Sequence, residues 1–352
     1  MMQNQINIRY GSYEIKALAA EIESKHYSSV FILVDSNTEA QCLTRFLELC
    51  PVVPTAVLKM KEGEAYKNLE TCQTVWEQLS EEGADRNSVL INLGGGVVTD
   101  LGGFVACAFK RGIAFYNIPT TLLAMVDASV GGKTGIDLGA LKNQIGIIRE
   151  PQAVIIDASW LETLPQNELR SGFAEMLKHG LIAHPAYWEE LKNITTLTPS
   201  TLEQYIQPSV AEKEKVVRED PNERGLRKIL NFGHTLGHAI ESYFLITPSK
   251  TRLLHGEAIA IGMVLEAYLS TLCTGLSKES AREIKSTFGA FFPKVALSNE
   301  DQKAILALLK HDKKNREGRI NFVLLEKIGT PVIDREVPQS LFDEAFAFYL
   351  ED

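Results

Sequence analysis

Short β-rich segments alternate with helical patterns through the first half of this 352-residue chain. This alternation is typical of a mostly parallel sheet with helices on both faces, whose ligands bind beyond the carboxyl ends of the strands. It predicts an α/β domain over residues 1–157. The predicted strands are 6–10, 29–34, 52–58, 88–93, 113–118 and 153–157, and the predicted helices are 14–25, 37–49, 65–82, 97–109 and 120–129.

The second half of the chain has a helical pattern, apart from a short hairpin expected around residues 319–333. A chain of this length more often forms two domains than one. We therefore expect a second, all-α domain over residues 158–352. Its predicted helices are 165–183, 201–219, 226–246, 255–273, 277–288, 299–310 and 338–350.

One stretch of the second half carries polar groups at helical spacing. Arg227, Asn231, His234, His238 and Glu241 lie four, three, four and three residues apart. On the helix predicted over 226–246 they share one stripe, and each group needs a partner if that stripe faces inward. The alternative is a solvated face that happens to hold two histidines. The glycines within the stretch favour close approach by another segment.

Two further segments supply possible metal ligands. His255 opens the next predicted helix, and Glu175 lies three residues before Lys178 on another. One glutamate and two histidines from separate helices suit a divalent metal with an open coordination position. The zinc-protease motif does not fit, because Thr235 stands where that motif needs glutamate.

The strand predicted at 88–93 runs into a glycine-rich turn at 94–96, ahead of a helix. Such glycines let backbone N–H groups approach a diphosphate, although a tight turn without a ligand has the same pattern. Asp35, at the end of another strand, could accept hydrogen bonds from a ribose diol or cap the next helix. Capping is the more frequent role. For Glu64 in a first helical turn, the alternative role is to complement the helix dipole.

A second glycine-rich stretch, residues 131–135, presents Lys133, with Lys142 and Asn143 nearby. It is not an ATPase phosphate loop, because Asp127 stands where that motif needs its first glycine. Lysines in such turns are candidates for phosphate or hydroxyl contacts, although isolated lysines are usually solvated. For Lys213, on the helix predicted over 201–219, the alternative role is burial of its aliphatic stem.

Composition excludes several classes of partner. The net charge of −9 argues against nucleic acid or an anionic membrane as the main partner. We find no apolar run near the roughly 20 residues of a membrane span, and no signal peptide at the start. Five scattered cysteines without a Cys-x-x-Cys motif favour reduced thiols in the cytoplasm.

Taken in order, eight segments closely resemble those of the 3-dehydroquinate synthases, which are sugar phosphate cyclases of the shikimate pathway. The segments are 94–100, 110–112, 119–121, 127–135, 173–178, 225–241, 255–257 and 312–314. The resemblance implies a Rossmann-like NAD-binding domain, a helical metal-binding domain, an active site in the interdomain cleft, and a homodimer. It also implies conversion of 3-deoxy-D-arabino-heptulosonate 7-phosphate to 3-dehydroquinate.

The resemblance assigns roles residue by residue. It implies that a zinc or cobalt ion is bound by Glu175, His234 and His255. It implies NAD contacts at Asp35, Glu64, Lys67, Gly95, Gly96, Val97, Val98, Thr99, Asp100, Thr120, Thr121, Asp127, Lys133 and Lys142. It implies substrate contacts or catalysis by Lys133, Asn143, Lys178, Lys213, Arg227, Asn231, His238 and Lys313 or Lys314, with Arg111 reaching the phosphate from a neighbouring subunit. His238 is the candidate for proton transfer.

Three other functions fit parts of this pattern. A metal-dependent polyol dehydrogenase would not need the phosphate-binding cations. A related cyclase that makes a valiolone or an inosose would differ at substrate contacts, and Lys213, Arg227 and Asn231 together favour dehydroquinate synthase. A non-catalytic NAD-binding protein should have lost a ligand or a lysine, and none is missing.

Overall fold

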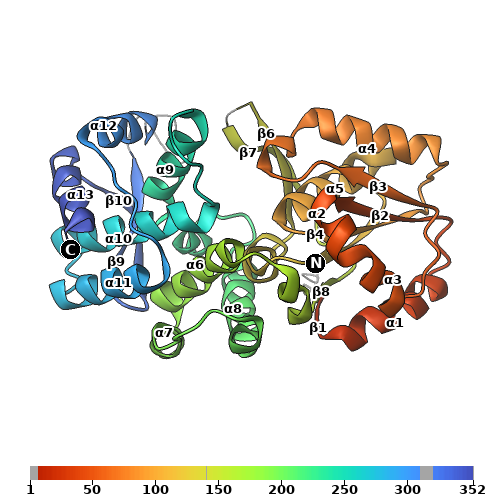
Figure 1. Ribbon diagram of the computed structural model, residues 1–352, viewed down its shortest axis with the longest axis horizontal. Coiled ribbons are helices and arrows are strands. Elements are labelled where there is room, and N and C mark those ends of the chain that lie inside the picture. The colour runs from red at the N-terminus through yellow and green to blue at the C-terminus, as the bar shows by residue number, and fades with distance from the viewer. Residues whose placement is uncertain (1–6, 140, 310–319, 352) are drawn as a thin grey trace. The chain divides into compact units, whose positions relative to one another are not determined.

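The computed structural model describes residues 7–139, 141–309 and 320–351. The chain forms two compact units. The first comprises Met1–Pro165 and Thr198–Val210, and the second comprises Gln166–Leu197 and Ala211–Asp352. Figure 1 shows that one unit is built around a sheet and that the other is largely helical. The domain limits 1–157 and 158–352 stay a prediction.

The first unit contains a six-stranded sheet whose neighbouring strands are all parallel, as predicted. The chain path reverses direction between β2 and β4, because β3 pairs with one edge of β2 and β4 with the other. Ligands of such sheets bind at this switch point. In spatial order the strands are β1 (Ile8–Tyr10), β8 (Val154–Ile156), β5 (Ala114–Pro119), β4 (Val89–Gly94), β2 (Val30–Asp35) and β3 (Ala56–Met60).

Helices cover both faces of this sheet (Figure 1). Phe31 and Leu33 of β2 belong to a hydrophobic core shared with α4 and α5. Their neighbours Ile32 and Val34 are also fully buried, and alternate strand residues point to opposite faces. The helices of the first unit are α1 (Ser12–Ser24), α2 (Ser36–Thr38), α3 (Thr44–Leu49), α4 (Leu69–Glu81), α5 (Gly96–Ala108) and the start of α8 (Pro199–Glu219).

Three local predictions for the first unit need correction. Residues 37–49 include a π-helix, Glu39–Leu43, and the helix predicted at 120–129 is π-helical over Ala124–Ala128. The glycine-rich turn predicted over 131–135 is confined to Gly131 and Gly132, with φ of 100° and 63°, and Lys133 then begins an antiparallel hairpin of β6 (Lys133–Leu138) and β7 (Leu141–Ile148). Its glycines let the strands pair closely, since a Cβ at Gly146 would lie 2.3 Å from the Thr134 carbonyl oxygen.

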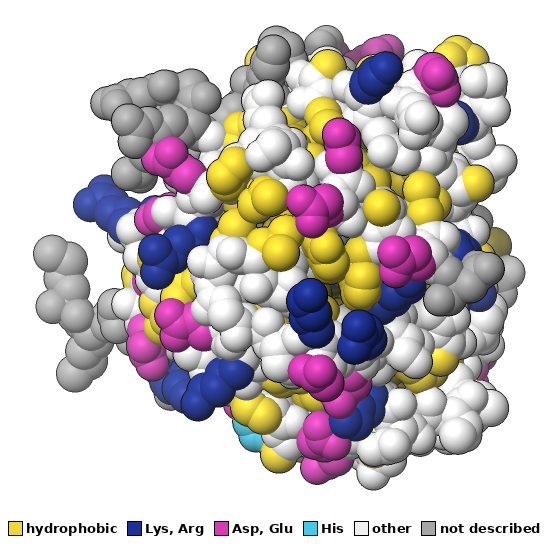
Figure 2. All heavy atoms as spheres, turned by 90° about the vertical axis from the view of Figure 1, so that its left-hand side faces the viewer, with side chains coloured by type: hydrophobic (Ala, Val, Ile, Leu, Met, Phe, Trp, Pro, Cys, Tyr) yellow, Lys and Arg dark blue, Asp and Glu magenta, His cyan; other side chains and the backbone are white. Residues whose placement is uncertain are grey.

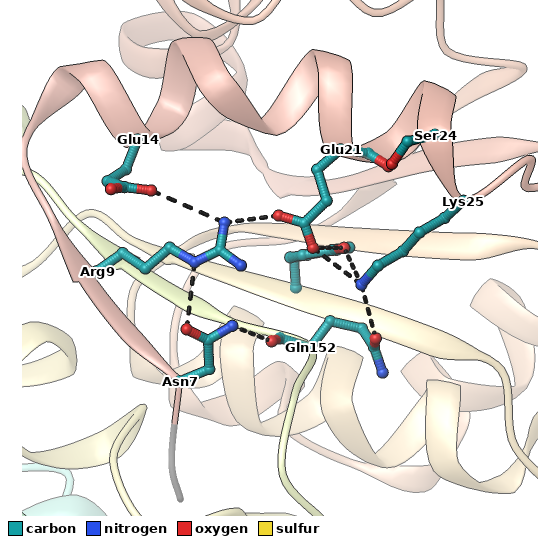
Figure 3. Close-up of polar contacts among 8 residues, drawn as sticks. Asn7, Arg9, Glu14, Glu21, Ser24, Lys25 and Gln152 are labelled. Carbon is teal, nitrogen blue, oxygen red and sulfur yellow. Dashed lines mark hydrogen bonds and ion pairs between the residues drawn. The ribbon is translucent and has the colours of Figure 1, made fainter.

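A network of ion pairs and hydrogen bonds joins α1 to β1 and to Gln152, just before β8 (Figure 3). Oε2 of Glu21 accepts from Arg9 at 2.6 Å, while Oε1 accepts from the hydroxyl of buried Tyr116 at 2.8 Å and lies 2.9 Å from Nζ of Lys25. Burial opposes ionisation of Glu21, but these hydrogen bonds outweigh it and lower its pKa to about 2. The network lies at the amino-terminal side of the sheet, away from the strand ends at which ligands bind.

The second unit is largely helical, as predicted, with one hairpin among its helices. Strands β9 (Asn321–Lys327) and β10 (Thr330–Glu336) form the predicted hairpin, which packs against α10. Its helices are α6 (Gln166–Ala183), α7 (Pro185–Lys192), the end of α8 (Pro199–Glu219), α9 (His234–Ile246), α10 (His255–Cys273), α11 (Lys278–Phe291), α12 (Asn299–Leu308) and α13 (Phe342–Leu350).

Helix α10 is the one described helix whose length and composition would allow a membrane span, although Glu257 and Glu266 interrupt its apolar residues. It has 19 residues, and its most apolar window has a mean hydropathy of 1.3. Of that window, 72% is buried inside the protein. By length and composition the helix could cross a membrane, but core helices have the same features, and here α10 packs against α6, α9, α11 and α13.

The helix predicted over 226–246 is interrupted. A 3-10 helix, η6 (Leu226–Asn231), ends before Gly233, whose φ of 79° is in the left-handed region, and α9 then begins at His234. A Cβ at Gly233 would lie 2.2 Å from Cγ of Met263, so the backbone at this break lies directly against α10. Arg227 and Asn231 are therefore not on the same helix as His234, His238 and Glu241.

The surface of the helical unit mixes charge types. Figure 2 faces the side of the molecule that carries α11 and α13, and it shows cationic and anionic side chains interspersed among hydrophobic ones. The net charge of −9 is thus not gathered into one acidic field on this face.

Candidate active site

Three side chains from three helices of the second unit converge. Glu175, on α6, is fully buried, and its Oε1 atom lies 3.6 Å from Nε2 of His234 and 3.7 Å from Nε2 of His255. His234 is the first residue of α9, and His255 is the first residue of α10. The structure thus brings together the three predicted metal ligands.

The other atoms of these ligands are held by the protein. Lys178, one turn along α6, donates to Oε2 of Glu175. Nδ1 of His234 lies 3.0 Å from the Phe232 carbonyl oxygen, and Nδ1 of His255 lies 3.3 Å from Oε2 of Glu241. These contacts place Nδ1–H as the donor on each ring and direct both Nε2 lone pairs toward Glu175.

The donor set fits a divalent metal. Oε1 of Glu175 is buried and has no hydrogen-bond partner among the described residues. A buried carboxylate oxygen without a partner is costly, and a cation beside it would remove that cost. One carboxylate and two imidazoles leave a coordination position open, as in catalytic sites.

His238 lies beside this group. Its ring centroid is 5.2 Å from that of His234 and 5.8 Å from that of His255. One nitrogen from each of the three histidines falls within 4.8 Å of the others, so His238 is also within reach of an ion at this place. His238 is half-buried, as a group that exchanges protons with a bound molecule requires.

The predicted cationic contacts of the second unit are mostly buried. Lys178 is 1% exposed, Arg227 is 2% exposed and Lys213 is 6% exposed. Arg227 is oriented by its backbone N–H, which donates to Asp220 at 3.1 Å, and by Nη1, which donates to the Pro221 carbonyl at 2.9 Å. Buried cations of this kind suit a polyanionic ligand, because charge-assisted hydrogen bonds are strongest out of water.

Asn231 donates to Glu223 at 2.7 Å, a partner that the sequence did not suggest. Lys313 and Lys314 lie outside the described residues.

In the first unit, the turn between β4 and α5 has the geometry of a phosphate-binding helix start. The N-cap Gly95 offers no side-chain cap to the first N–H groups of α5. A Cβ at Gly94 would lie 2.6 Å from Cβ of Val98, and one at Gly95 would lie 2.9 Å from Cγ2 of Thr121. Only glycines fit this turn, and the helix start suits a diphosphate. Gly96, Val97, Val98, Thr99 and Asp100 form the first turns of α5, with Thr99 buried.

The other predicted NAD contacts lie near the carboxyl ends of the strands. Asp35 ends β2 and caps α2, its Oδ1 accepting from Thr38 N at 2.8 Å, so the capping role is the one the structure shows. Buried Thr120 follows β5 and donates through its N–H to Gly94 at 3.0 Å, and Thr121 follows it. Asp127 is half-buried on the π-helix η4 (Ala124–Ala128).

A closed polar cluster contains further predicted residues of the first unit. Buried Lys67 contacts Asp100 and Asn143, each at 2.6 Å. Burial opposes the charge on Lys67, but the attraction of Asp100 outweighs it and raises the pKa of Lys67. Asn143, whose φ is 50°, donates its N–H to Asp137 at 2.6 Å, and Lys142 lies 3.4 Å from Glu64.

Lys133 and Arg111 are exposed. Lys133 begins β6. Arg111 ends the 3-10 helix η3 (Phe109–Arg111), and both it and Lys110 have φ in the left-handed region, at 72° and 49°. Within the described residues of this chain, both side chains thus reach solvent.

Sequence reasoning missed two acids with structural roles in these clusters, Asp137 and Glu266. Asp137 fixes Asn143 and donates its own N–H to the Lys67 carbonyl at 2.8 Å. Glu266 is fully buried at the middle of α10. A signal for Glu266 was present, because an acid amid an otherwise apolar stretch of helix is rarely buried without a specific partner.

Comparison with known proteins shows the family. Residues 57–171 match the model "3-dehydroquinate synthase N-terminal", and residues 172–315 match "3-dehydroquinate synthase C-terminal". A 3-dehydroquinate synthase of Parabacteroides distasonis is 42% identical over 333 residues, which is 94% of each chain. That of Campylobacter concisus is 38% identical over 96% of each chain.

Among solved structures, 2-deoxy-scyllo-inosose synthase complexed with carbaglucose-6-phosphate, NAD+ and Co2+ has a TM-score of 0.83 and 25% identity, covering 98% of this chain and 96% of that one. The fold is thus that of sugar phosphate cyclases. With both family models and relatives matched along nearly the whole length, the chain belongs to the 3-dehydroquinate synthase family.

Proposed function

We propose that this protein is a phosphate-eliminating carbon–oxygen lyase that converts 3-deoxy-D-arabino-heptulosonate 7-phosphate to 3-dehydroquinate and phosphate. The observation that carries the proposal is the buried Glu175 oxygen, without a hydrogen-bond partner among the described residues, opposite Nε2 of two histidines. In the reaction the C5 hydroxyl is oxidised, phosphate leaves by β-elimination, the ketone is reduced again, and ring opening and an aldol addition close the carbocycle.

Glu175, His234 and His255 would hold the divalent metal, zinc or cobalt. When bound, the ion supplies Lewis acidity toward an alcohol or carbonyl oxygen of the substrate. The protein's own contribution is orientation. Lys178 holds one oxygen of Glu175, while Phe232 and Glu241 hold the Nδ1 sides of the two rings.

NAD supplies the hydride acceptor when bound and is regenerated within one turnover. We assign its diphosphate to the uncapped start of α5, at Gly95, Gly96 and the N–H groups that follow. Asp35 caps α2 through Oδ1, which leaves Oδ2 to accept from a ribose hydroxyl. We assign further contacts to Glu64, Lys67, Val97, Val98, Thr99, Asp100, Thr120, Thr121, Asp127, Lys133 and Lys142.

The substrate is a polyanion and needs cations. We assign its recognition to Lys133, Asn143, Lys178, Lys213, Arg227, Asn231 and Lys313, of which Lys178, Lys213 and Arg227 are buried. Buried cations favour an anionic ligand over a neutral polyol, so they support the cyclase reaction over polyol dehydrogenation. His238, one turn after His234, would transfer a proton to or from the substrate.

We also propose that the protein is a homodimer, in which Arg111 of one subunit binds the substrate phosphate in the active site of the other. Among the described residues, strand β7 pairs only with β6, and it exposes Leu141, Ile147 and Ile148, at 48%, 37% and 56%. An apolar edge strand of this kind usually pairs or is covered. Ile148→Lys should convert a dimer to monomers in sedimentation velocity, and a monomeric wild-type chain would contradict this part of the proposal.

The five unpaired thiols suit the reducing cytoplasm, where we place the protein.

The decisive experiment measures phosphate release from the heptulosonate phosphate together with absorbance of NADH. We expect release that stops with a chelator, returns with zinc or cobalt, and leaves no net NADH. His234→Ala should lower release by more than ~100-fold, whereas the control His184→Ala, at the N-cap of α7, should keep it. Metal-independent release would overturn the site, and NADH accumulation from a simple polyol would indicate a dehydrogenase.

The role of His238 has its own test. At saturating metal, His238→Ala should lower turnover by roughly 100-fold, the usual contribution of a general acid or base. A variant with wild-type turnover would remove His238 from the proton transfer.

A further inference from the structure

The start of α9 is capped from another helix. Glu266 of α10 is fully buried, and its Oε2 accepts from the N–H of Gly233 at 2.7 Å. Its Oε1 accepts from the N–H groups of Thr235 and Leu236, each at 3.1 Å. The first N–H groups of a helix have no partner inside it, and a carboxylate is also favoured there by the helix dipole. One side chain therefore serves three of these donors.

The cap comes from α10 because α9 cannot supply one. The N-cap residue is Gly233, which has no side chain to accept a hydrogen bond. A Cβ there would lie 2.2 Å from Cγ of Met263, and a Cβ at Gly262 would lie 2.0 Å from the Gly233 carbonyl oxygen. The two helices are too close at this point for an ordinary N-cap side chain.

The capped residues flank His234. Gly233 precedes it, and Thr235 and Leu236 follow it, so all three hydrogen bonds fix the backbone from which this imidazole projects. Helix α10 also begins with His255. One helix therefore provides one histidine and anchors the backbone of the other.

We propose that Glu266 is a positioning residue that fixes His234 relative to Glu175 and His255 for metal binding. This inference rests on the metal site proposed above. Metal affinity depends on how well the ligands are arranged before binding, and loss of a supporting contact commonly lowers it about 10- to 100-fold. Glu266 touches no reacting atom, so its removal should act on metal affinity and only through that on turnover.

The test is zinc affinity of the full-length apoprotein, measured by competition with a chromogenic chelator in the absence of NAD and substrate. Glu266→Gln keeps the shape but presents an NH2 group to N–H donors, and we expect about 10-fold weaker zinc binding. At saturating zinc, kcat should return close to the wild-type value. A folded Glu266→Gln protein with wild-type zinc affinity would overturn the inference.

A matched control separates positioning from stability. Asp301 of α12 is also a buried carboxylate at a helix start, accepting from Ser298 N at 2.8 Å. Asp301→Asn should lower the melting temperature as Glu266→Gln does, but should leave zinc affinity within about twofold. An equal loss of affinity in both variants would also overturn the inference.

Two outcomes distinguish this inference from the proposed function. A wild-type protein that binds no zinc would remove the metal site and the inference together, whereas an unaffected Glu266→Gln variant would remove only the inference. If Glu266→Gln does not fold, amide hydrogen exchange of the wild-type protein tests the inference instead. Zinc should increase protection of the Thr235 and Leu236 amides, and unchanged protection of both would overturn the inference.

Discussion

Two polar clusters, one in each unit, differ in how their charges are satisfied. In the first unit, Lys67 contacts Asp100 and Asn143, and Asp137 holds Asn143 in turn, so the contacts form a closed chain. In the second unit, Glu175 has one oxygen bound by Lys178 and the other without a hydrogen-bond partner among the described residues.

The difference indicates two ways in which a buried charge serves binding. A closed cluster is satisfied within the chain, so it shapes the backbone around a ligand and stabilises the fold. An open carboxylate oxygen is costly without a cation, so it is retained where a cation binds. The comparison therefore predicts that substitutions in the closed cluster change stability first, and substitutions at the open one change metal affinity first.

The largest effect should come from Glu175→Gln. Loss of the ligand charge should weaken zinc binding by more than ~1,000-fold, since loss of an outer contact alone commonly costs 10- to 100-fold. Competition with a chelator measures it. The control Glu168→Gln alters a partly buried carboxyl on the same helix and should bind zinc as the wild type does. Near-normal affinity in Glu175→Gln would erase the distinction between the clusters.

The closed cluster should show its effect in stability. Lys67→Met leaves Asp100 beside an apolar side chain, and breaking a buried ion pair costs about 3 kcal/mol. The matched variant Lys142→Met breaks a looser pair with Glu64, at 3.4 Å and with both side chains 21% exposed, and should cost below about 1 kcal/mol. Urea unfolding followed by circular dichroism compares them. Equal stability losses would show that closure of the cluster contributes nothing.

Glu241 tests whether a residue that contacts a metal ligand, and not the metal, also affects zinc affinity. Glu241→Gln replaces the carboxylate that lies 3.3 Å from Nδ1 of His255, and it should weaken zinc binding about 10-fold with little change in unfolding. Titration calorimetry gives the affinity, and Glu283→Gln, on α11, is the control. A lower free energy of unfolding with unchanged zinc affinity would show that Glu241 stabilises the fold, as the cluster around Lys67 does, and does not support metal binding.

The smallest effect concerns the second closed network of the first unit. The pKa of Glu21 is lowered to about 2, so its stabilising contribution is present above the ordinary pKa of about 4.5 and is lost as the pH falls toward 2. Because its side chain is 20% exposed, we expect only about 1 kcal/mol. Glu21→Gln should melt below the wild type at pH 7, with the difference vanishing near pH 2. A constant difference across this range would mean that Glu21 acts by packing.

The sequence predicted most elements correctly because their signals are local. Helix α10 and the strand β4 with its glycines were visible from spacing and composition alone. The predictions of secondary structure failed where a glycine is required by close packing between segments and does not mark a turn or a helix interior. Gly135 suggested part of a turn, but it lets β6 pair closely with β7, and Gly233 lies at a break between η6 and α9 within a stretch predicted as one helix.

The sequence by itself determined the alternation of strands and helices and the candidate metal ligands Glu175, His234 and His255. Hydrophobic periodicity and side-chain chemistry are properties of single segments, so both can be read without the fold. Only the tertiary structure decided that Oε1 of Glu175 faces both histidines and that Glu266 caps a residue 33 positions away. Those contacts depend on how helices pack, and local periodicity does not encode the distance between segments far apart in the chain.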